Sequence, residues 1–530
     1  QMKDMDRLVE ILAQKIRKQV HIRIIGDYDV DGVTSSHLFL TALRRVGAKV
    51  DVVIPHRIQD GYGLSLHLLQ QAKEDGVDTI LTCDNGIAAI DEIAWAKAQK
   101  MTVLVTDHHA VPFEEHEGRR TEKKSLADAV VNPHQQDCGY PYKELCGAGV
   151  AWNVIRVLYE NYDMDKREAE DLLDFVAMAT VCDVMSLTGE NRILVKEGLK
   201  RIRHTKNIGL QALMQACNVQ PENISAYHFG YVLGPCVNAT GRLDTARHAL
   251  RLFETGQETE AEEIARDLVD LNQERKELTL QGVEMAKKLC EEGGYENDPV
   301  LVLFLPDVHE SIAGLIAGRI REMYNRPVFV LTRGEEGVKG SGRSTENYSM
   351  YENMCGCAEL FTKFGGHPMA AGLSLPEENV EKFRRKINEN CPLTVEEVCP
   401  DIHIDMAMPV GYASTELVHQ FALLEPFGKD NPSPLFADRN LSISRMWVIG
   451  KNRNVLRMSV LSEYGQPVPV IFFGDVETLF AYFTEKFGQE EVENALHGRK
   501  NRILFSMVYT AKIDFYQGNE NLQLEMKYYR

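Results

Sequence analysis

The sequence lacks the features that mark several large classes of protein. It has no apolar run near the roughly 20 residues that a membrane-spanning helix needs. Its 11 cysteines are odd in number and show no paired CxxC spacing, so we expect reduced, mostly buried thiols rather than a zinc site. The first 20 residues predict an amphipathic helix without a signal peptide's apolar centre, so the expected location is the cytoplasm.

An excess of positive charge is also missing. The net charge of −19 argues against a protein that coats duplex DNA non-specifically, although it leaves room for a local basic groove. At 530 residues the chain is too long for one core, and about three or four domains are expected. Local patterning must therefore indicate what each domain does.

The order of apolar runs divides the chain into parts. From residue 21 to about 131, short apolar runs alternate with helical segments, as in an α/β domain with a parallel sheet. Residues 256–293 predict one long helix, which would reach about 50 Å and could bridge two domains. A second α/β unit follows, with strands PVLVLFL and PVFVLT, and after about Glu396 short alternating strands predict a small all-β barrel of the OB type.

Three carboxylates lie within five residues in the stretch GDYDVDG, at the end of a short apolar strand predicted over His21–Ile25. They are Asp27, Asp29 and Asp31. The spacing matches the start of an EF-hand calcium loop, but position twelve is Leu38 instead of Glu, and a strand precedes the loop where an EF-hand has a helix. The stretch therefore predicts a carboxylate-rich turn around Gly32, followed by a helix that begins near Thr34.

Further acidic or histidine clusters lie at or near the ends of predicted elements. They are TCDNG with Asp84, VTDHHAV with Asp107, His108 and His109, and ATVCDVMSL with Asp183. Ligands in open α/β sheets collect at the carboxyl ends of strands, so these groups can meet. Aspartate and histidine without cysteine suit manganese or magnesium, and carboxylates can bridge two ions about 3.5 to 4 Å apart. Singly, each motif is weak, because DNG is more often a plain turn and DHH can be a capping Asp beside two surface histidines.

In this order and context, the motifs resemble the DHH phosphoesterase superfamily and, within it, the RecJ family of single-strand-specific 5′ to 3′ exonucleases. The resemblance covers nearly the whole chain, through PHRIQDGYGL, NPHQQDCGYP, LCGAGVAW, VNATGRLDTA, GSGRS, FGGHPMAAGLSL and LEPFGKDNPSPLF. It implies an α/β protein with a parallel-sheet DHH domain over 1–255, a long connecting helix over 256–293, a smaller α/β DHHA1 domain over 294–394 and an all-β OB-fold over 395–530.

The resemblance also implies a metal site and catalytic groups. The matching metal ligands are Asp29, Asp31, Asp84, His108 and Asp183. Asp84 would bridge two ions and act in catalysis with His108, while His109 would face the scissile phosphate. Manganese pyrophosphatases of the superfamily have a histidine at the position of Ile25, and Asp27 would be the substitute ligand here. Another departure is Val308, where RecJ sequences commonly have Trp, and altered packing is expected there.

Two sets of residues are candidates for binding the nucleic acid. Matches in glycine-rich or loop contexts that suit phosphate binding are Arg57, Arg242, Ser341, Arg343 and His367. The β domain contributes Arg445, Trp447, Arg453 and Arg457, in a stretch that has Arg439 and Lys451 but no acidic residue between Asp438 and Glu463. The alternatives are ordinary salt bridges for the first set, a tight turn for GGH around His367, and a solvated barrel face for the second.

The implied function is a single-stranded-DNA-specific 5′ to 3′ exonuclease that releases 5′-mononucleotides in DNA repair and recombination, with two Mn²⁺ or Mg²⁺ ions as cofactors. Expected partners are single-stranded DNA, single-strand-binding protein and a helicase, with no membrane and a monomeric state. A phosphodiesterase for short oligonucleotides or cyclic dinucleotides is the alternative, but such relatives resemble only the first two domains. A replisome scaffold that has lost its ligands is another, although this chain keeps its acidic and histidine set.

Overall fold

The structure is a computed structural model that describes all residues except 58–59, 62, 117–118, 244, 296–297, 335–336, 392, 394–401, 451–453 and 517–518. The chain forms two compact units, Gln1–Pro400 and Asp401–Arg530, each with its own hydrophobic core. Within the described ranges, no helix combines the length and the apolar character needed to cross a membrane.

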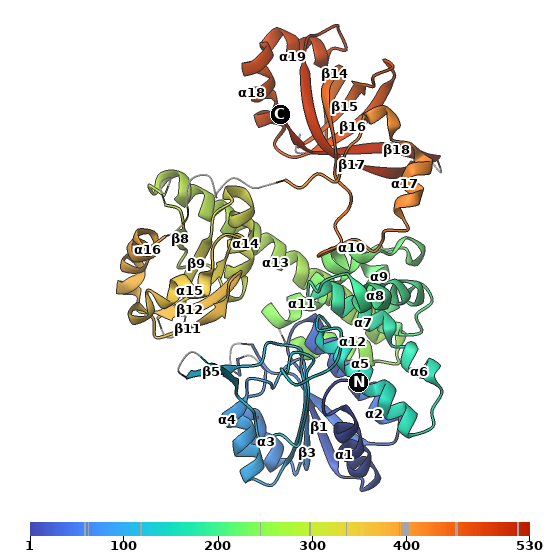
Figure 1. Cartoon of the computed structure of the whole chain (residues 1–530), viewed down its shortest axis with the longest axis vertical. Helices are drawn as coiled ribbons and strands as arrows, with labels where there is room; N and C mark the ends of the chain where they lie inside the picture. The colour runs from blue at the N-terminus through green and yellow to red at the C-terminus, as the bar shows by residue number, and fades with distance from the viewer. Residues whose placement is uncertain are drawn as a thin grey trace. The chain divides into compact units, whose positions relative to one another are not determined.

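The first unit begins with a five-stranded parallel sheet in the order β2-β1-β3-β4-β7, as the alternating pattern predicts. Its strands are β1 (His21–Ile25), β2 (Lys49–Val53), β3 (Thr79–Cys83), β4 (Thr102–Thr106) and β7 (Ala129–Val131). Helices α1 (Met5–Arg17), α2 (Val30–Arg45) and α5 (Gly147–Asn161) pack on one face, and α3 (Leu66–Glu74) and α4 (Ile90–Ala98) pack on the other (Figure 1). Both faces are covered, which explains the continuous Val, Ile and Leu runs.

The register of this sheet aligns the ends of its central strands. Ile25 pairs with Thr82, and Thr106 pairs with both Cys83 and Val131. The loops that leave β1, β3 and β4 therefore start at the same edge. That edge carries the carboxylate-rich turn, TCDNG and VTDHHAV motifs.

Helix α2 begins earlier than expected. Its first residue is Val30, not a residue near Thr34, and Asp29 is its N-cap. The Oδ1 atom of Asp29 accepts a hydrogen bond of 3.0 Å from the backbone N–H of Gly32. This cap satisfies a free N–H of the first turn, so Gly32 lies inside the helix and not in a turn before it. Asp31 consequently lies on the first helical turn.

A mostly helical segment follows the sheet. Its elements after α5 are α6 (Lys166–Glu170), α7 (Leu173–Cys182), α8 (Gly189–Ile202), α9 (Ile208–Ala216), α10 (Ala226–His228), a π-helical turn (Phe229–Leu233), α11 (Gly234–Leu243) and α12 (Ala246–Glu254). A hairpin of β5 (Phe113–His116) and β6 (Arg119–Glu122) lies before it, between β4 and β7. The predicted long helix is α13 (Glu258–Glu292), whose 35 residues give a length of about 50 Å. It contributes to the cores at both of its ends.

The remainder of the first unit contains a second sheet in the order β11-β12-β10-β9-β8. Its elements are β8 (Leu301–Phe304), α14 (Ala313–Tyr324), β9 (Val328–Arg333), β10 (Val338–Arg343), α15 (Met350–Cys355), β11 (Lys363–His367), β12 (Ala370–Leu375) and α16 (Val380–Glu389). The two predicted strands are present, and three more join them. The GGH stretch belongs to strand β11 and not to a turn at a helix end.

The second unit is the predicted all-β barrel. Its elements are β13 (Met406–Ala407), α17 (Thr415–Phe421), β14 (Phe436–Ile449), β15 (Val455–Leu461), β16 (Pro467–Phe473), α18 (Val476–Phe487), α19 (Gln489–Leu496), β17 (Leu504–Tyr516) and β18 (Asn519–Tyr529). Pairing of β14 with β17 closes the sheet. Buried and partly exposed residues alternate along β15, as expected for a strand with one face in a core.

Candidate functional site

Carboxylates from three separate segments meet a histidine from a fourth at the edge of the parallel sheet. The Nε2 atom of His108 lies 3.1 Å from Oδ1 of Asp84. It lies 3.6 Å from Oδ2 of Asp31 and 3.6 Å from Oδ2 of Asp183. His108 follows β4, and Asp84 follows β3. Asp31 is on the first turn of α2, and Asp183 is the C-cap of α7.

The cluster divides into overlapping sets that could each hold a metal ion. These sets are Asp27, Asp29 and Asp84; Asp31, His108 and Asp183; and Asp84, His108 and His109, with ligand atoms within 4.8 Å of one another. Asp84 and His108 each belong to two sets. The structure therefore brings together all six predicted metal ligands.

The electrostatics of the cluster favour cations. Burial and the carboxylate of Asp29 raise the pKa of Asp27 well above its usual value, and burial together with Asp31 and Asp29 does the same for the pKa of Asp84. The Oδ2 atom of Asp27 and the Nε2 atom of His108 are buried and make no hydrogen bond. A buried polar atom without a hydrogen-bond partner lowers the stability of the folded protein. Divalent ions bound by Asp27 Oδ2 and His108 Nε2 would supply the missing partners, so these residues fit a metal site.

Backbone groups hold Asp31 in place. Its Oδ2 accepts a hydrogen bond of 2.6 Å from the N–H of Gly147, and its Oδ1 accepts one of 2.7 Å from Ala148. Both donors belong to the first turn of α5, within the LCGAGVAW motif. A Cβ atom at Gly147 would lie 2.7 Å from Cβ of Asp84, so only glycine permits this approach.

His109 is oriented by Asp107, to which the sequence assigns no role of its own. The Nδ1 atom of His109 lies 2.8 Å from Oδ1 of Asp107, and Asp107 also accepts the N–H of Ile87 at 2.8 Å. Burial lowers the pKa of His109, but the hydrogen bond and the charge of Asp107 outweigh it, with smaller contributions from other carboxylates, and raise the pKa to about 9. The contact with Asp107 fixes the orientation of the His109 ring.

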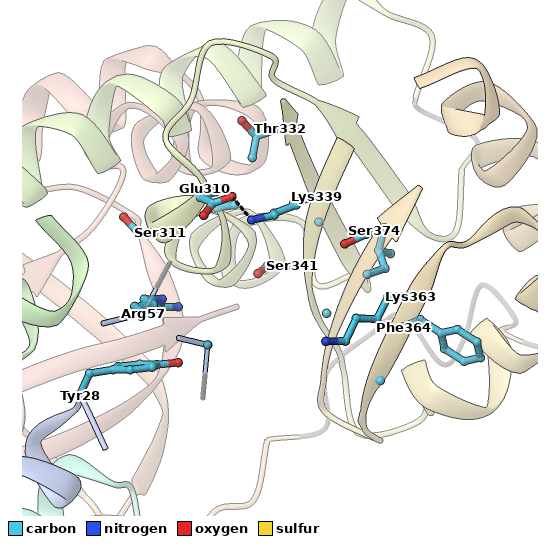
Figure 2. Close-up of a pocket in the computed structure, with 16 residues that line it drawn as sticks. Tyr28, Arg57, Glu310, Ser311, Thr332, Lys339, Ser341, Lys363, Phe364 and Ser374 are labelled. Carbon is cyan, nitrogen blue, oxygen red and sulfur yellow. Dashed lines mark ion pairs between the residues drawn. The ribbon is translucent and has the colours of Figure 1, made fainter. Parts of the chain in front are cut away.

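A cavity of about 430 Å³ lies next to this centre, between residues of the parallel-sheet part and residues of the second sheet (Figure 2). Arg57 and Tyr28 are on one side, with the Arg57 guanidinium 5.1 Å from the centre of the Tyr28 ring. Ser341 and Lys363 are on the opposite side, and Lys339 forms an ion pair with Glu310 inside the cavity. Arg57 and Ser341 are predicted from the sequence, whereas the two lysines are not, because they flank the GSGRS and FGGH motifs without belonging to them.

Arg242 and Arg343 lie close to the same cavity without lining it. Burial lowers the pKa of Arg242 to about 10, and the neighbouring Arg57, Arg275 and Arg343 add to this effect. Burial and then Arg57 likewise lower the pKa of Arg343. Like charges gathered in a partly buried place favour an anion between them.

His367 is not brought to this cavity. It is exposed at the end of strand β11, outside the set of residues that line the hollow. Its predicted contact with substrate stays a prediction.

The second unit carries a separate face with cations and aromatic rings. Trp447 of β14 pairs directly with Arg457 of β15, and the Arg445 guanidinium lies 5.7 Å from the Trp447 ring centre. The register of β15 with β16 puts Phe473, which is 57% exposed, on the same face. Sequence reasoning misses Phe473 because only the strand register shows that it joins this face. Arg453 lies outside the described residues.

Family models match the chain in the order of its parts. The model of the DHH family N-terminal domain matches residues 21–180, the DHHA1 domain matches 297–391, and the RecJ OB domain matches 404–528. The fold and the carboxylate-histidine centre therefore define a DHH-family protein with an added OB domain.

Comparison with individual proteins narrows this class. The single-stranded-DNA-specific exonuclease RecJ of Haemophilus influenzae is 33% identical over 549 residues, which cover 100% of this chain and 91% of that protein. The RecJ of Bacillus subtilis is 33% identical over 470 residues, and the match covers 88% of this chain but 58% of that longer protein. The chain belongs to the RecJ family.

A solved structure of the family has the same fold. RecJ from Thermus thermophilus, crystallised in complex with Mn²⁺, is 26% identical and superposes with a TM-score of 0.80. The superposition covers 100% of this chain and 72% of that one. The predicted family and fold class are confirmed.

Proposed function

We propose that the chain is a metal-dependent exonuclease that takes single-stranded DNA by its 5′ end and releases 5′-mononucleotides, in DNA repair and recombination. Membership of the RecJ family supports the class of activity and the single-stranded substrate. The observation that carries the proposal is the buried Nε2 atom of His108, which faces three carboxylates and makes no hydrogen bond.

Two divalent ions, Mn²⁺ or Mg²⁺, would be held by the six predicted ligands. They are Asp27, Asp29, Asp31, Asp84, His108 and Asp183, and Asp84 would be shared. Such a pair supplies a hydroxide from water at neutral pH and neutralises charge on the phosphate. Burial lowers the pKa of His108, so the ring stays neutral with a lone pair for ligation. His109, which Asp107 orients, would face the scissile phosphate.

The 5′ to 3′ direction of digestion would come from the arginine cluster beside the 430 Å³ cavity. Arg57, Arg242 and Arg343, together with the hydroxyl of Ser341, would bind the leading 5′ phosphate. Their mutual repulsion is relieved by a dianion, so a strand that begins with a phosphate gains more than one that begins with a hydroxyl. The Arg445, Trp447 and Arg457 face of the barrel would bind the strand farther from its end.

The domain boundaries 1–255, 256–293, 294–394 and 395–530 are part of this proposal, and the matched family models fall within the first, third and fourth of them. Single-strand-binding protein and a helicase would be partners of the monomer. The cytoplasmic location stays a prediction.

A nuclease assay with Mn²⁺ tests the proposal. Uniform single strands labelled at the 5′ end should release labelled mononucleotide first, while blunt duplexes of the same sequence should stay intact. Dinucleotides and cyclic dinucleotides serve as rival substrates. Preferential cleavage of the dinucleotides, or first release of label from the 3′ end, would contradict it.

A further inference from the structure

Two tyrosines stack on each other at the surface of the first unit, away from any residue assigned above. Tyr227 and Tyr231 are 63% and 71% exposed, their ring centres are 5.2 Å apart, and the ring planes differ by 23°. Both lie in residues 226–243, a helical run that consists of α10, the π-helical turn and α11. Large aromatic side chains usually bury their rings, so a stacked pair left open to solvent offers an aromatic surface to a ligand.

The backbone beneath the pair is well fixed. The N–H of Ser225 donates a hydrogen bond of 3.1 Å to Nδ1 of His228, which caps the start of the run. Phe229, between the two tyrosines in sequence, is fully buried in the core. Tyr231 belongs to the π-helical turn, a type of distortion that is frequent at functional sites. The stacked rings are therefore presented by a rigid element.

The same run lies along the metal centre. The backbone carbonyl of Phe229 accepts a hydrogen bond of 3.2 Å from Sγ of Cys182, which directly precedes Asp183. Nine residues farther along the run, Oδ1 of Asn238 accepts the N–H of Val30 at 3.1 Å, at the start of the helix that carries Asp31. The tyrosines thus flank the contact beside Asp183, and the contact beside Asp31 lies farther along the same run.

The far end of the run belongs to the arginine cluster. Arg242 donates a hydrogen bond of 2.7 Å to the backbone carbonyl of Ser311, and its charge acts on Arg57 and Arg343. At a rise of about 1.5 Å per residue, Tyr231 and Arg242 are separated by about 16 Å along the axis. The run therefore passes from the arginines, past the carboxylates, to the tyrosines.

We propose that Tyr227 and Tyr231 form a stacking platform for bases of single-stranded DNA on the 3′ side of the scissile phosphate. The proposal rests on the proposed function, because it takes the arginine end of the run as the site of the 5′ phosphate. A strand that starts there and crosses the ions must leave toward the other end of the run. Tyrosine rings stack on any base, which suits an enzyme that must pass every sequence.

Steady-state kinetics with strands of different length test this inference. The double variant Tyr227→Ala, Tyr231→Ala should raise KM for a 5′-phosphorylated 12-mer by about 5- to 100-fold, the range for loss of one base stack. Its kcat on the 12-mer, and both constants on a dinucleotide too short to reach the platform, should match the unaltered chain. The matched variant Tyr227→Phe, Tyr231→Phe keeps the rings and should behave as the unaltered chain does.

A spectroscopic readout separates stacking from a general effect on the fold. The full chain with Asp84→Ala is used, because hydrolysis is expected to be lost in it. When the fluorescent base 2-aminopurine is placed at successive positions of the strand, its fluorescence should be quenched at one or two positions after the first linkage. The quenching should vanish when Tyr227→Ala and Tyr231→Ala are added. Equal KM values for the alanine and unaltered chains would overturn the platform, as would an equal rise in KM on the dinucleotide. Unchanged kinetics on bare DNA with lost stimulation by single-strand-binding protein would assign the tyrosines to a protein partner instead. No cleavage of single strands by the unaltered chain would instead refute the proposed function.

Discussion

The metal centre of the first unit and the exposed face of the barrel in the second unit handle charge in opposite ways. At the metal centre, Asp27, Asp84 and His108 are buried, and the carboxylates are crowded against one another. On the barrel face, Arg445 is exposed and rests against Trp447, which is 37% exposed. The first arrangement is unstable without a specific ligand, whereas the second tolerates solvent and salt.

This difference assigns catalysis to the metal centre and substrate binding to the barrel face. Crowded, desolvated carboxylates define the position of metal ions closely, as a reaction centre requires. Exposed cations beside a ring give affinity that adds up along a strand and falls with ionic strength. Substitutions at the two places should therefore change different measured quantities.

The largest effect is expected from Asp84→Ala. Loss of the shared carboxylate should reduce hydrolysis of single strands by at least about 10³-fold, because metal assistance is worth several kcal/mol of barrier. The melting temperature without added metal should not fall, since an acid whose pKa is raised by burial and like charge has been removed. Asp27→Ala is the matched variant and should lose less activity. Rates equal to those of the unaltered chain would remove the proposed bridge.

A smaller loss is expected from Asp107→Asn, which keeps the size of the side chain and removes its charge. Groups that orient residues at a metal centre typically contribute about 10- to 100-fold to activity or metal affinity. We expect kcat to fall in that range with KM little changed, because Asp107 is buried and contacts His109. A change confined to KM would show that the pair serves binding.

Arg343→Ala should act on the strand end. Removing a charged hydrogen-bond donor to phosphate costs about 1.5 to 3 kcal/mol, so any preference for 5′-phosphorylated over 5′-hydroxyl strands should shrink by about 10- to 100-fold. Arg319→Ala is the control, because Arg319 is an exposed arginine already paired with Glu322. An intact preference in Arg343→Ala would place the end pocket elsewhere.

The smallest effect on turnover is expected from the double variant Arg445→Ala, Arg457→Ala. Each phosphate contact on a single strand contributes about 0.7 to the slope of log affinity against log salt, so the slope should flatten by about 1.4. Turnover at saturating substrate should not change. Arg502→Ala, a cation of the same unit paired with Glu491, should leave the slope unaltered. Fluorescence anisotropy across a salt series measures the slope for each variant. Equal slopes for the Arg445→Ala, Arg457→Ala variant and the unaltered chain would make this face an ordinary solvated surface.

The metal centre is the part that sequence predicts best, because its geometry follows from topology. Parallel strands end together, so residues that follow Ile25, Cys83 and Thr106 must converge. The start of α2 is predicted wrongly because glycine is typical of turns. In the structure, the N–H of Gly32 donates a hydrogen bond to the side chain of Asp29, which caps the helix. Such a cap is a local detail that composition alone does not reveal.

Other features depend on contacts that no local pattern contains. Strands β10 (VKGSGR), β11 (KFGGH) and β12 (AAGLSL) contain glycine, which is depleted in strands, so these three of the five strands of the second sheet escape prediction. The role of Asp107 and the mutual influence of the arginines need distances between distant segments. The stacked tyrosines depend on the helical run that carries them.

The crowded carboxylates also affect the stability of the folded protein and therefore its lifetime. A ligand that binds only the folded chain stabilises it by about 2.7 kcal/mol when its free concentration is a hundred times its dissociation constant. Acids held close together at Asp27, Asp29 and Asp84 oppose folding until cations bind them. The supply of divalent ions should thus govern the folded fraction and resistance to proteolysis as well as the rate of hydrolysis, which ties the abundance of the enzyme to the cofactor that makes it active.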